Sequence, residues 1–271
     1  IGIDPQTGDF ANVPGIRDFV NVFGGLAGEP AGTVIGAPPY TGEAELSSLA
    51  SDTNPATDYY YAVSNNVHFS PGGGVPDYDA AVLVRVNADG SSTQIAPLQD
   101  DTEPTFAFNG ITALDFDSGG TLWGIGWVVD TLPPDNTTTP PTPNPPDQPV
   151  TGNNVPIRFL LNIDTATGVT TRVAQLTPPD ADISTIAYDP ANDYFLGVNA
   201  GNDHLVVVSK TGVIADIGAL HIAGTNNAVT GMTGLEFDEN GTLYGVAGGN
   251  LYEINPSDGA CTLTGNVGVQ N

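Results

Sequence analysis

The sequence predicts an all-β fold, a β-propeller of five four-stranded antiparallel blades. Three observations support this prediction: a phrase repeats along the chain, a second hairpin follows each copy, and the copies recur at a nearly constant interval. Internal repeats of this length are typical of folds in which one supersecondary unit is stacked several times. The whole chain of 271 residues is therefore expected to form a single domain.

The repeated phrase is clearest where it begins at Ile111 and at Met232. There Ile-Thr-Ala-Leu-Asp-Phe-Asp and Met-Thr-Gly-Leu-Glu-Phe-Asp each lead on to Gly-Thr-Leu, an aromatic residue and Gly. Weaker copies begin at Leu46 and Ile183. Apolar and polar residues alternate in each copy, and Asp, Asn, Ser and Gly separate its two halves. This pattern predicts two strands, each with one buried face, joined by a tight turn.

A second hairpin follows each copy of the phrase. The run Leu-Tyr-Glu-Ile-Asn-Pro-Ser-Asp-Gly from Leu251 is one example, and similar runs begin at Val82, Phe159 and Leu205. Another short apolar strand follows each of them. Two hairpins give four strands per repeat, which is one propeller blade.

The spacing of the copies sets the predicted number of blades. The four starts are at 46, 111, 183 and 232, so the shortest interval is 49 residues. An ungapped alignment of residues 1–13 on 186–198 places another start 48 residues before Leu46. We therefore expect five blades, with approximate boundaries at 1–36, 46–98, 111–176, 183–220 and 232–268.

The first of these blades would have its inner strand clipped by two or three residues. Because Ile1 is not a start methionine, we expect the chain to be a processed or incomplete product. The alternative is a fragment of a larger propeller whose missing strands lie outside this sequence.

The charge balance limits the classes of partner. The sequence has 31 acidic and five basic residues and a net charge of −26, so it would repel phosphate backbones and is not expected to bind nucleic acid. No apolar run approaches the roughly 18 residues that span a membrane. Such a composition suits a secreted protein, a high-salt habitat or a cation-rich environment. Cys261, the only cysteine, is expected to be buried and inert.

The sequence beyond the bare repeat is concentrated in two loops, roughly 64–80 and 128–156, and in the connection 97–110. In a propeller all three would lie on the same face, which is where a rigid scaffold carries binding loops. No cofactor is certain from the sequence, and calcium is the one that it allows for. These loops contain acids that could supply oxygen ligands to calcium or could simply be solvated: Asp77, Asp79, Asp100, Asp101 and Glu103. They also contain aromatic residues that could stack on a ligand or pack the loops down: Phe69, Tyr78, Phe106 and Phe108.

The segment 132–149 has a different composition, because eight of its 18 residues are proline. It is expected to be extended polyproline II, and its Thr and Pro content is like that of glycosylated stalks. The segment is either an arm that contacts a neighbouring subunit or a solvated loop. Asn136 and Asn240 begin sequons for N-glycosylation.

The sequence lacks a Gly-x-Ser-x-Gly elbow, a His-Glu-x-x-His helix and a phosphate-binding glycine loop. Phrases such as Gly-Thr-Leu-Tyr-Gly-Val, followed by Leu-Tyr-Glu-Ile-Asn-Pro, resemble those of secreted bacterial β-propellers of the NHL/YVTN-like and quinoprotein-like type. The resemblance implies a blade architecture. Some related propellers are lactonases that hold a divalent metal in the central channel.

We expect a non-enzymatic extracellular propeller that serves as a structural, self-assembling or binding component of a cell surface or matrix. Its partners would be further copies of itself, joined into oligomers or filaments, or a surface glycan. Two alternatives remain open. One is a metal-dependent hydrolase or lactonase that uses the central channel, and the other is a carbohydrate-binding propeller.

Overall fold

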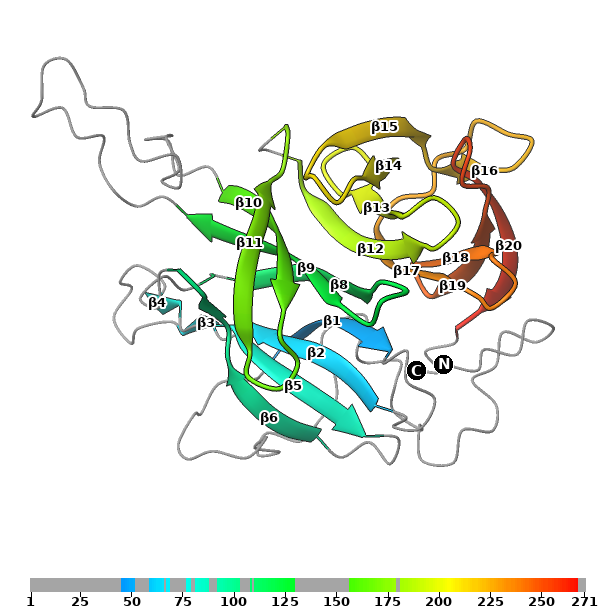
Figure 1. The fold of residues 1–271 in the computed structure, drawn as a ribbon. Coiled ribbons are helices and arrows are strands. Elements are labelled where there is room, and N and C mark those ends of the chain that lie inside the picture. Colours follow the sequence, from blue (N-terminus) through cyan, green and yellow to red (C-terminus); the bar gives the residue numbers. More distant parts are fainter. Residues whose placement is uncertain are drawn as a thin grey trace, which may run out of the picture.

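The computed structural model describes residues 45–51, 59–65, 67–68, 77–78, 81–87, 92–102, 108, 110–129, 156–178 and 181–267. They form an all-β propeller of four blades, arranged around four inner strands (Figure 1). The propeller prediction is confirmed, but the count of five blades is not supported, because the structure shows four. The additional blade was predicted at 1–36, which lies outside the described residues. No helix among the described residues is long and apolar enough to cross a membrane.

Each blade is an antiparallel sheet whose strands follow one another along the chain. Blade 1 consists of β1 (Glu45–Ser51), β2 (Tyr59–Asn65), β5 (Val82–Asn87) and β6 (Ser92–Pro97). Blade 2 consists of β8 (Gly110–Phe116), β9 (Leu122–Val129), β10 (Pro156–Ile163) and β11 (Val169–Gln175). Blade 3 consists of β12 (Ile183–Asp189), β13 (Tyr194–Asn199), β14 (His204–Val208) and β15 (Ile214–Ala219). Blade 4 consists of β17 (Met232–Phe237), β18 (Leu243–Ala247), β19 (Asn250–Ile254) and β20 (Ala260–Asn266).

The core lies between the blades, because both faces of a blade carry apolar side chains. Tyr61 of blade 1 packs edge-on against Phe116 of blade 2, with ring centroids 5.7 Å apart. At the next interface Phe195 of blade 3 lies 5.6 Å from Trp123 of blade 2. Burial of these faces supplies the main driving force for joining successive blades.

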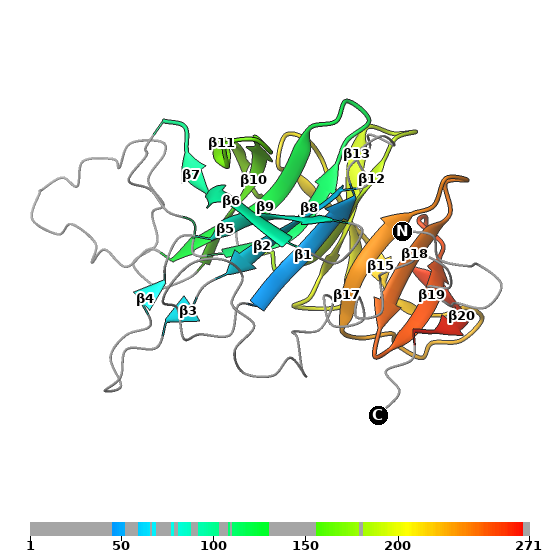
Figure 2. The same ribbon diagram turned by 90° about the horizontal axis from the view of Figure 1, so that it is seen from below.

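Two-residue strands connect the blades in a way that the sequence does not predict. The connector that leaves β6 forms β7 (Gln99–Asp100), which pairs in parallel with β11 of the next blade (Figure 2). The connector that leaves β15 forms β16 (His221–Ile222), which pairs in the same way with β20. Thr177, beyond β11, makes a parallel bridge to Val213. Each connector thus covers the outer edge of the following blade.

Each connector begins with a fully buried leucine. The connector lies against a turn of the following blade, just before its outer strand, and this turn contains a glycine. The leucines are Leu98, Leu176 and Leu220. The glycine between β14 and β15, Gly212, has a φ of 80°, and a Cβ there would lie 2.7 Å from the Cβ of Ala174 and 2.8 Å from the carbonyl oxygen of Gln175. Only glycine allows both this backbone conformation and this close approach between blades.

Candidate functional site

Two of the acids predicted to bind a metal lie in the connector between blades 1 and 2. The Asp100 side chain is fully buried, and its Oδ2 lies 2.6 Å from Nε of Arg172 on β11. Its Oδ1 accepts hydrogen bonds from the backbone N–H and the hydroxyl of Thr102. Asp100 therefore fastens the connector to β11 and is not a loop acid open to a cation. Asp101 is exposed and accepts a hydrogen bond from the Thr171 hydroxyl at 2.6 Å.

Of the aromatic candidates, Phe108 is fully buried in the core between blades 1 and 2. Its ring packs the core and has no free surface on which a ligand could stack.

Asp77 and Tyr78 form β4 (Asp77–Tyr78), which pairs with β3 (Val67–His68) in the insertion of blade 1. The remaining candidates lie outside the described residues and stay predictions: Phe69, Asp79, Glu103, Phe106 and Asn136. Among the described residues, no three His, Cys, Asp or Glu side chains are grouped so that they could hold a metal ion.

The aspartate that ends the repeated phrase closes the turn after β8, β12 and β17. Oδ1 of Asp117 accepts hydrogen bonds from the backbone N–H groups of Gly119 and Thr121, at 2.9 and 3.0 Å. Asp238 accepts the equivalent bonds from Asn240 and Thr242. The bond from Thr242 lowers the pKa of Asp238, against a smaller effect of burial. These aspartates therefore serve the fold as turn caps.

Asn240 occupies the exposed turn between β17 and β18. Its side-chain amide donates a hydrogen bond to Oδ2 of Asp238 at 3.2 Å. The turn presents the sequon at the surface, and its glycosylation stays a prediction.

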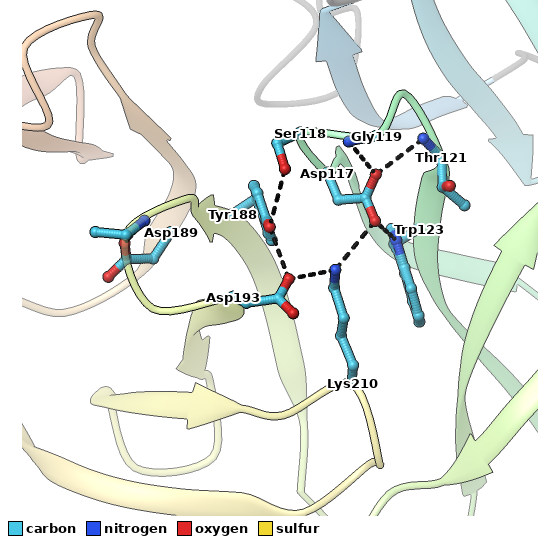
Figure 3. Close-up of polar contacts among 10 residues, drawn as sticks. Asp117, Ser118, Gly119, Thr121, Trp123, Tyr188, Asp189, Asp193 and Lys210 are labelled. Atoms are coloured by element: carbon cyan, nitrogen blue, oxygen red, sulfur yellow. Dashed lines mark hydrogen bonds and ion pairs between the residues drawn. The ribbon is translucent and has the colours of Figure 1, made fainter.

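A cluster of polar and aromatic side chains surrounds Lys210, the only lysine of the chain (Figure 3). Its Nζ lies 3.1 Å from Oδ2 of Asp117 in blade 2 and 2.5 Å from Oδ1 of Asp193 in blade 3. It also lies 5.5 Å from the ring centroid of Trp123 and 5.0 Å from that of Tyr188. Trp123 donates its indole N–H to Asp117, and Tyr188 donates its hydroxyl to Asp193. Two acids and two aromatic rings therefore hold one ammonium group between two blades.

The chemistry of this cluster is that of a structural clamp. Partial burial disfavours the charge on Lys210, but hydrogen bonds to Asp193 and Asp117 outweigh it and raise the pKa of the ammonium above its ordinary value. A lysine that keeps its proton cannot act as a base or a nucleophile. We therefore assign the cluster to the joining of blades 2 and 3.

Hydrogen bonds from side chains also join the inner strands to one another. The hydroxyl of Thr112 on β8 donates to the carbonyl of Ile183 on β12 at 2.7 Å. The hydroxyl of Ser184, at the same position of the next repeat, donates to the carbonyl of Met232 on β17 at 3.3 Å. The second residue of the repeated phrase thus links β8 to β12 and β12 to β17.

Two acids occupy the fifth position of the phrase, Asp115 on β8 and Glu236 on β17. Asp115 accepts hydrogen bonds from the backbone N–H groups of Phe116 and Tyr188, and burial raises its pKa to about 7. The Glu236 side chain is exposed, and the protein around it, followed by the charge of Asp115, raises the pKa of its carboxyl group above the ordinary value. The two carboxyl groups therefore interact electrostatically.

Every basic side chain in the described part of the chain has a partner within the molecule. Arg158 pairs with Asp182 at 2.5 Å, and the guanidinium of Arg85 lies 4.4 Å above the ring of Tyr59. Arg172 and Lys210 are held as described above. The charge that the described surface offers to other molecules is consequently negative.

No protein-family model matches the sequence, and no curated protein matches it significantly. Solved structures do share its fold. A protein of unknown function from Dyadobacter fermentans matches with a TM-score of 0.52 and 12% identity, over 84% of this chain and 65% of that one. A gluconolactonase from Xanthomonas campestris has a TM-score of 0.42 and 13% identity, over 86% and 87% of the two chains.

An auxiliary nutrient binding protein from Bacteroides ovatus matches with a TM-score of 0.40 and 14% identity, over 80% of this chain and 56% of that one. This chain spans only 42% and 59% of the length of two other matching structures, from Bacteroides thetaiotaomicron and Bacteroides caccae. At such low identity these similarities show the β-propeller fold alone.

Proposed function

We propose that this protein is a non-enzymatic extracellular propeller, an acidic component of a cell surface or matrix whose copies associate through divalent cations. The observation that carries the proposal is that the basic side chains of the described residues all make contacts within the molecule. Arg85, Arg158, Arg172 and Lys210 all serve the fold, so the described surface has no free cation to offer a partner.

A surface of this kind constrains how copies could meet. With a net charge of −26, two copies repel one another at low ionic strength. Calcium can bind carboxylate oxygens from two surfaces at once, which removes the repulsion and adds a bond. Sodium can only screen the charge. The proposal therefore separates a calcium effect from an effect of ionic strength.

The test uses the full chain in three buffers: with a chelator, with millimolar calcium, and with sodium chloride matched to the ionic strength of the calcium buffer. We expect light scattering and electron microscopy to show oligomers or filaments with calcium, and fewer or none in the matched salt. Uniformly monomeric particles in all three buffers would overturn the proposal. Equal association in calcium and in matched salt would show screening without bridging, which also contradicts it.

A further inference from the structure

The described blades form an arc with two free ends. Their inner strands contact one another in chain order, β1 with β8, β8 with β12 and β12 with β17. One hydrophobic cluster joins blades 1 and 2, a second joins blades 2 and 3, and a third joins blades 3 and 4. Among the described residues no cluster joins blade 4 to blade 1. The outward faces of these two blades, here called the end faces, therefore do not pack against each other.

The end face of blade 1 is apolar and is nevertheless buried. Its residues cluster only with one another among the described residues: Tyr60, Ala62, Val82, Val84 and Val86. The exposed fraction is 8% for Tyr60, 0% for Ala62 and 1% for Val84. One sheet layer cannot bury its own face to this degree. Among the described residues, no other blade joins this cluster.

The end face of blade 4 repeats the pattern by which blades 2 and 3 bind their successors. In those two blades the neighbouring pairs Ile125–Leu160 and Val198–Leu205 are fully buried against the next blade. Blade 4 has Val246 beside Leu251 in the same register. Leu251 is buried, but Val246 and the nearby Tyr244 are only half-buried. Blade 4 thus carries an apolar face built for a successor that the described residues do not supply.

The inner strand of blade 4 and the residue that follows its outer strand also resemble the parts of earlier blades that contact the next blade. Thr233 occupies the position of Thr112 and Ser184, but among the described residues it donates only to Val246 of its own hairpin, at 3.3 Å. Val267 follows β20 as Leu220 follows β15, and its N–H bonds back to Gly249 as that of Leu220 bonds to Asp203. The chain therefore leaves blade 4 in the geometry that elsewhere leads to the next blade.

We propose that residues 1–44 of this chain dock between the two end faces and join blade 4 to blade 1. This inference is independent of the proposed function. Blade 3 spans 37 residues, from Ile183 to Ala219, so the 44 residues that precede β1 are long enough to cover both faces. They lead directly into blade 1, whose end face is the buried one. Phe10 and Val13 also have the spacing of Phe195 and Val198, which are core residues of blade 3.

The test keeps the full chain and cuts it after folding, at a specific protease site inserted between Ala44 and Glu45. We expect the 44-residue fragment to stay bound through gel filtration, with a particle mass of one chain. Hydrogen exchange should be slowed within residues 1–44, both before and after cutting. Release of the fragment on cutting, or amides in it that exchange as in a free peptide, would overturn the proposal. A particle of twice the mass would also overturn it, because the occupant would then be a second copy.

A charge on the end face provides the matched variant. Val246→Asp places a carboxylate on a half-buried site of blade 4 and should speed release of the cut fragment by about tenfold or more. Val213→Asp places the same charge on a 54% exposed site outside the end faces and should leave release unchanged. Equal rates in the two variants would contradict docking on blade 4. If Val246→Asp fails to fold, the cut wild-type chain still decides the question.

Discussion

At the scale of single residues, Lys210 shows how an acidic chain can use a rare cation. The chain has one lysine, and its ammonium bridges a carboxylate of blade 2 and a carboxylate of blade 3 while lying near the rings of Trp123 and Tyr188. Asp117 is the more important of the two acids. Its side chain is 10% exposed, whereas that of Asp193 is 69% exposed. An ion pair is weak in water and stronger where water is excluded.

Replacing this lysine should weaken the joint between blades 2 and 3. Lys210→Met should lower the free energy of unfolding by about 1–3 kcal/mol, because Asp117 then keeps a partly buried charge without its cation. Asp193→Asn is the comparison, and its effect should be much smaller because that carboxylate is solvated. Urea denaturation of both variants measures the difference. Equal losses would show that burial of Asp117 is irrelevant to the clamp.

Asp115 should make stability depend on pH in an unusual direction. Burial raises its pKa from 3.8 to about 7, so between these values the folded state holds a proton that the unfolded state has released. The Asp115 contribution to the free energy of unfolding must therefore fall as the pH rises from about 4 to about 7. Asp115→Asn removes this titration. The free energy of wild type minus that of the variant should decrease across this interval, and a constant difference would disprove the assignment.

At the scale of elements, the connectors join the blades through backbone pairing that requires glycine. Gly168, Gly212 and Gly259 occupy equivalent turns before the outer strands, and each lies against the end of the preceding blade. The backbone N–H of Thr177 donates to the carbonyl of Gly212 at 3.0 Å. The contact is thus made by main chain on both sides, and a side chain at the turn would separate the two blades.

Comparing Gly212 with Gly241 separates the free-energy cost of backbone strain from the cost of a side chain at the close contact between blades. Gly212 and Gly241 both have a φ of 80°, but a Cβ on Gly241 would meet nothing within 4 Å. Gly241→Ala should cost about 1 kcal/mol of unfolding free energy, from strain alone. Gly212→Ala should cost a further 1–3 kcal/mol or so, because the new methyl group displaces the end of β11. Thermal and chemical denaturation measure both variants, and similar costs would mean that the connector yields easily.

The elements also show which parts of the fold the sequence can predict. Alternation over six or seven residues, followed by Asp and Gly, marks the inner hairpins such as β8 and β9. The connector strands β7 and β16 have two residues each, too few to show any period. The Lys210 clamp is also hidden, since Lys210 and Asp117 are 93 residues apart. The only signal for it is the presence of one lysine in a chain with 31 acids.

At the scale of the whole molecule, the repeat predicts the propeller but not the residues that face a ligand. The same phrase that predicts the blades supplies Asp117, Asp189 and Asp238, whose carboxylates close turns. Asp100 and Phe108 could be predicted to lie in one connection, but their burial depends on Arg172 and on the facing blade. Burial by a distant part of the chain leaves no local trace in the sequence.

The connectors have a consequence for how the protein is made. The carbonyl of Gln99 accepts a hydrogen bond from the hydroxyl of Thr170, 71 residues later in the chain. On the ribosome, each connector is therefore synthesised well before the strand with which it pairs. When a new blade folds, the connector that pairs with its outer strand is already present. The propeller is therefore expected to assemble in the direction of translation.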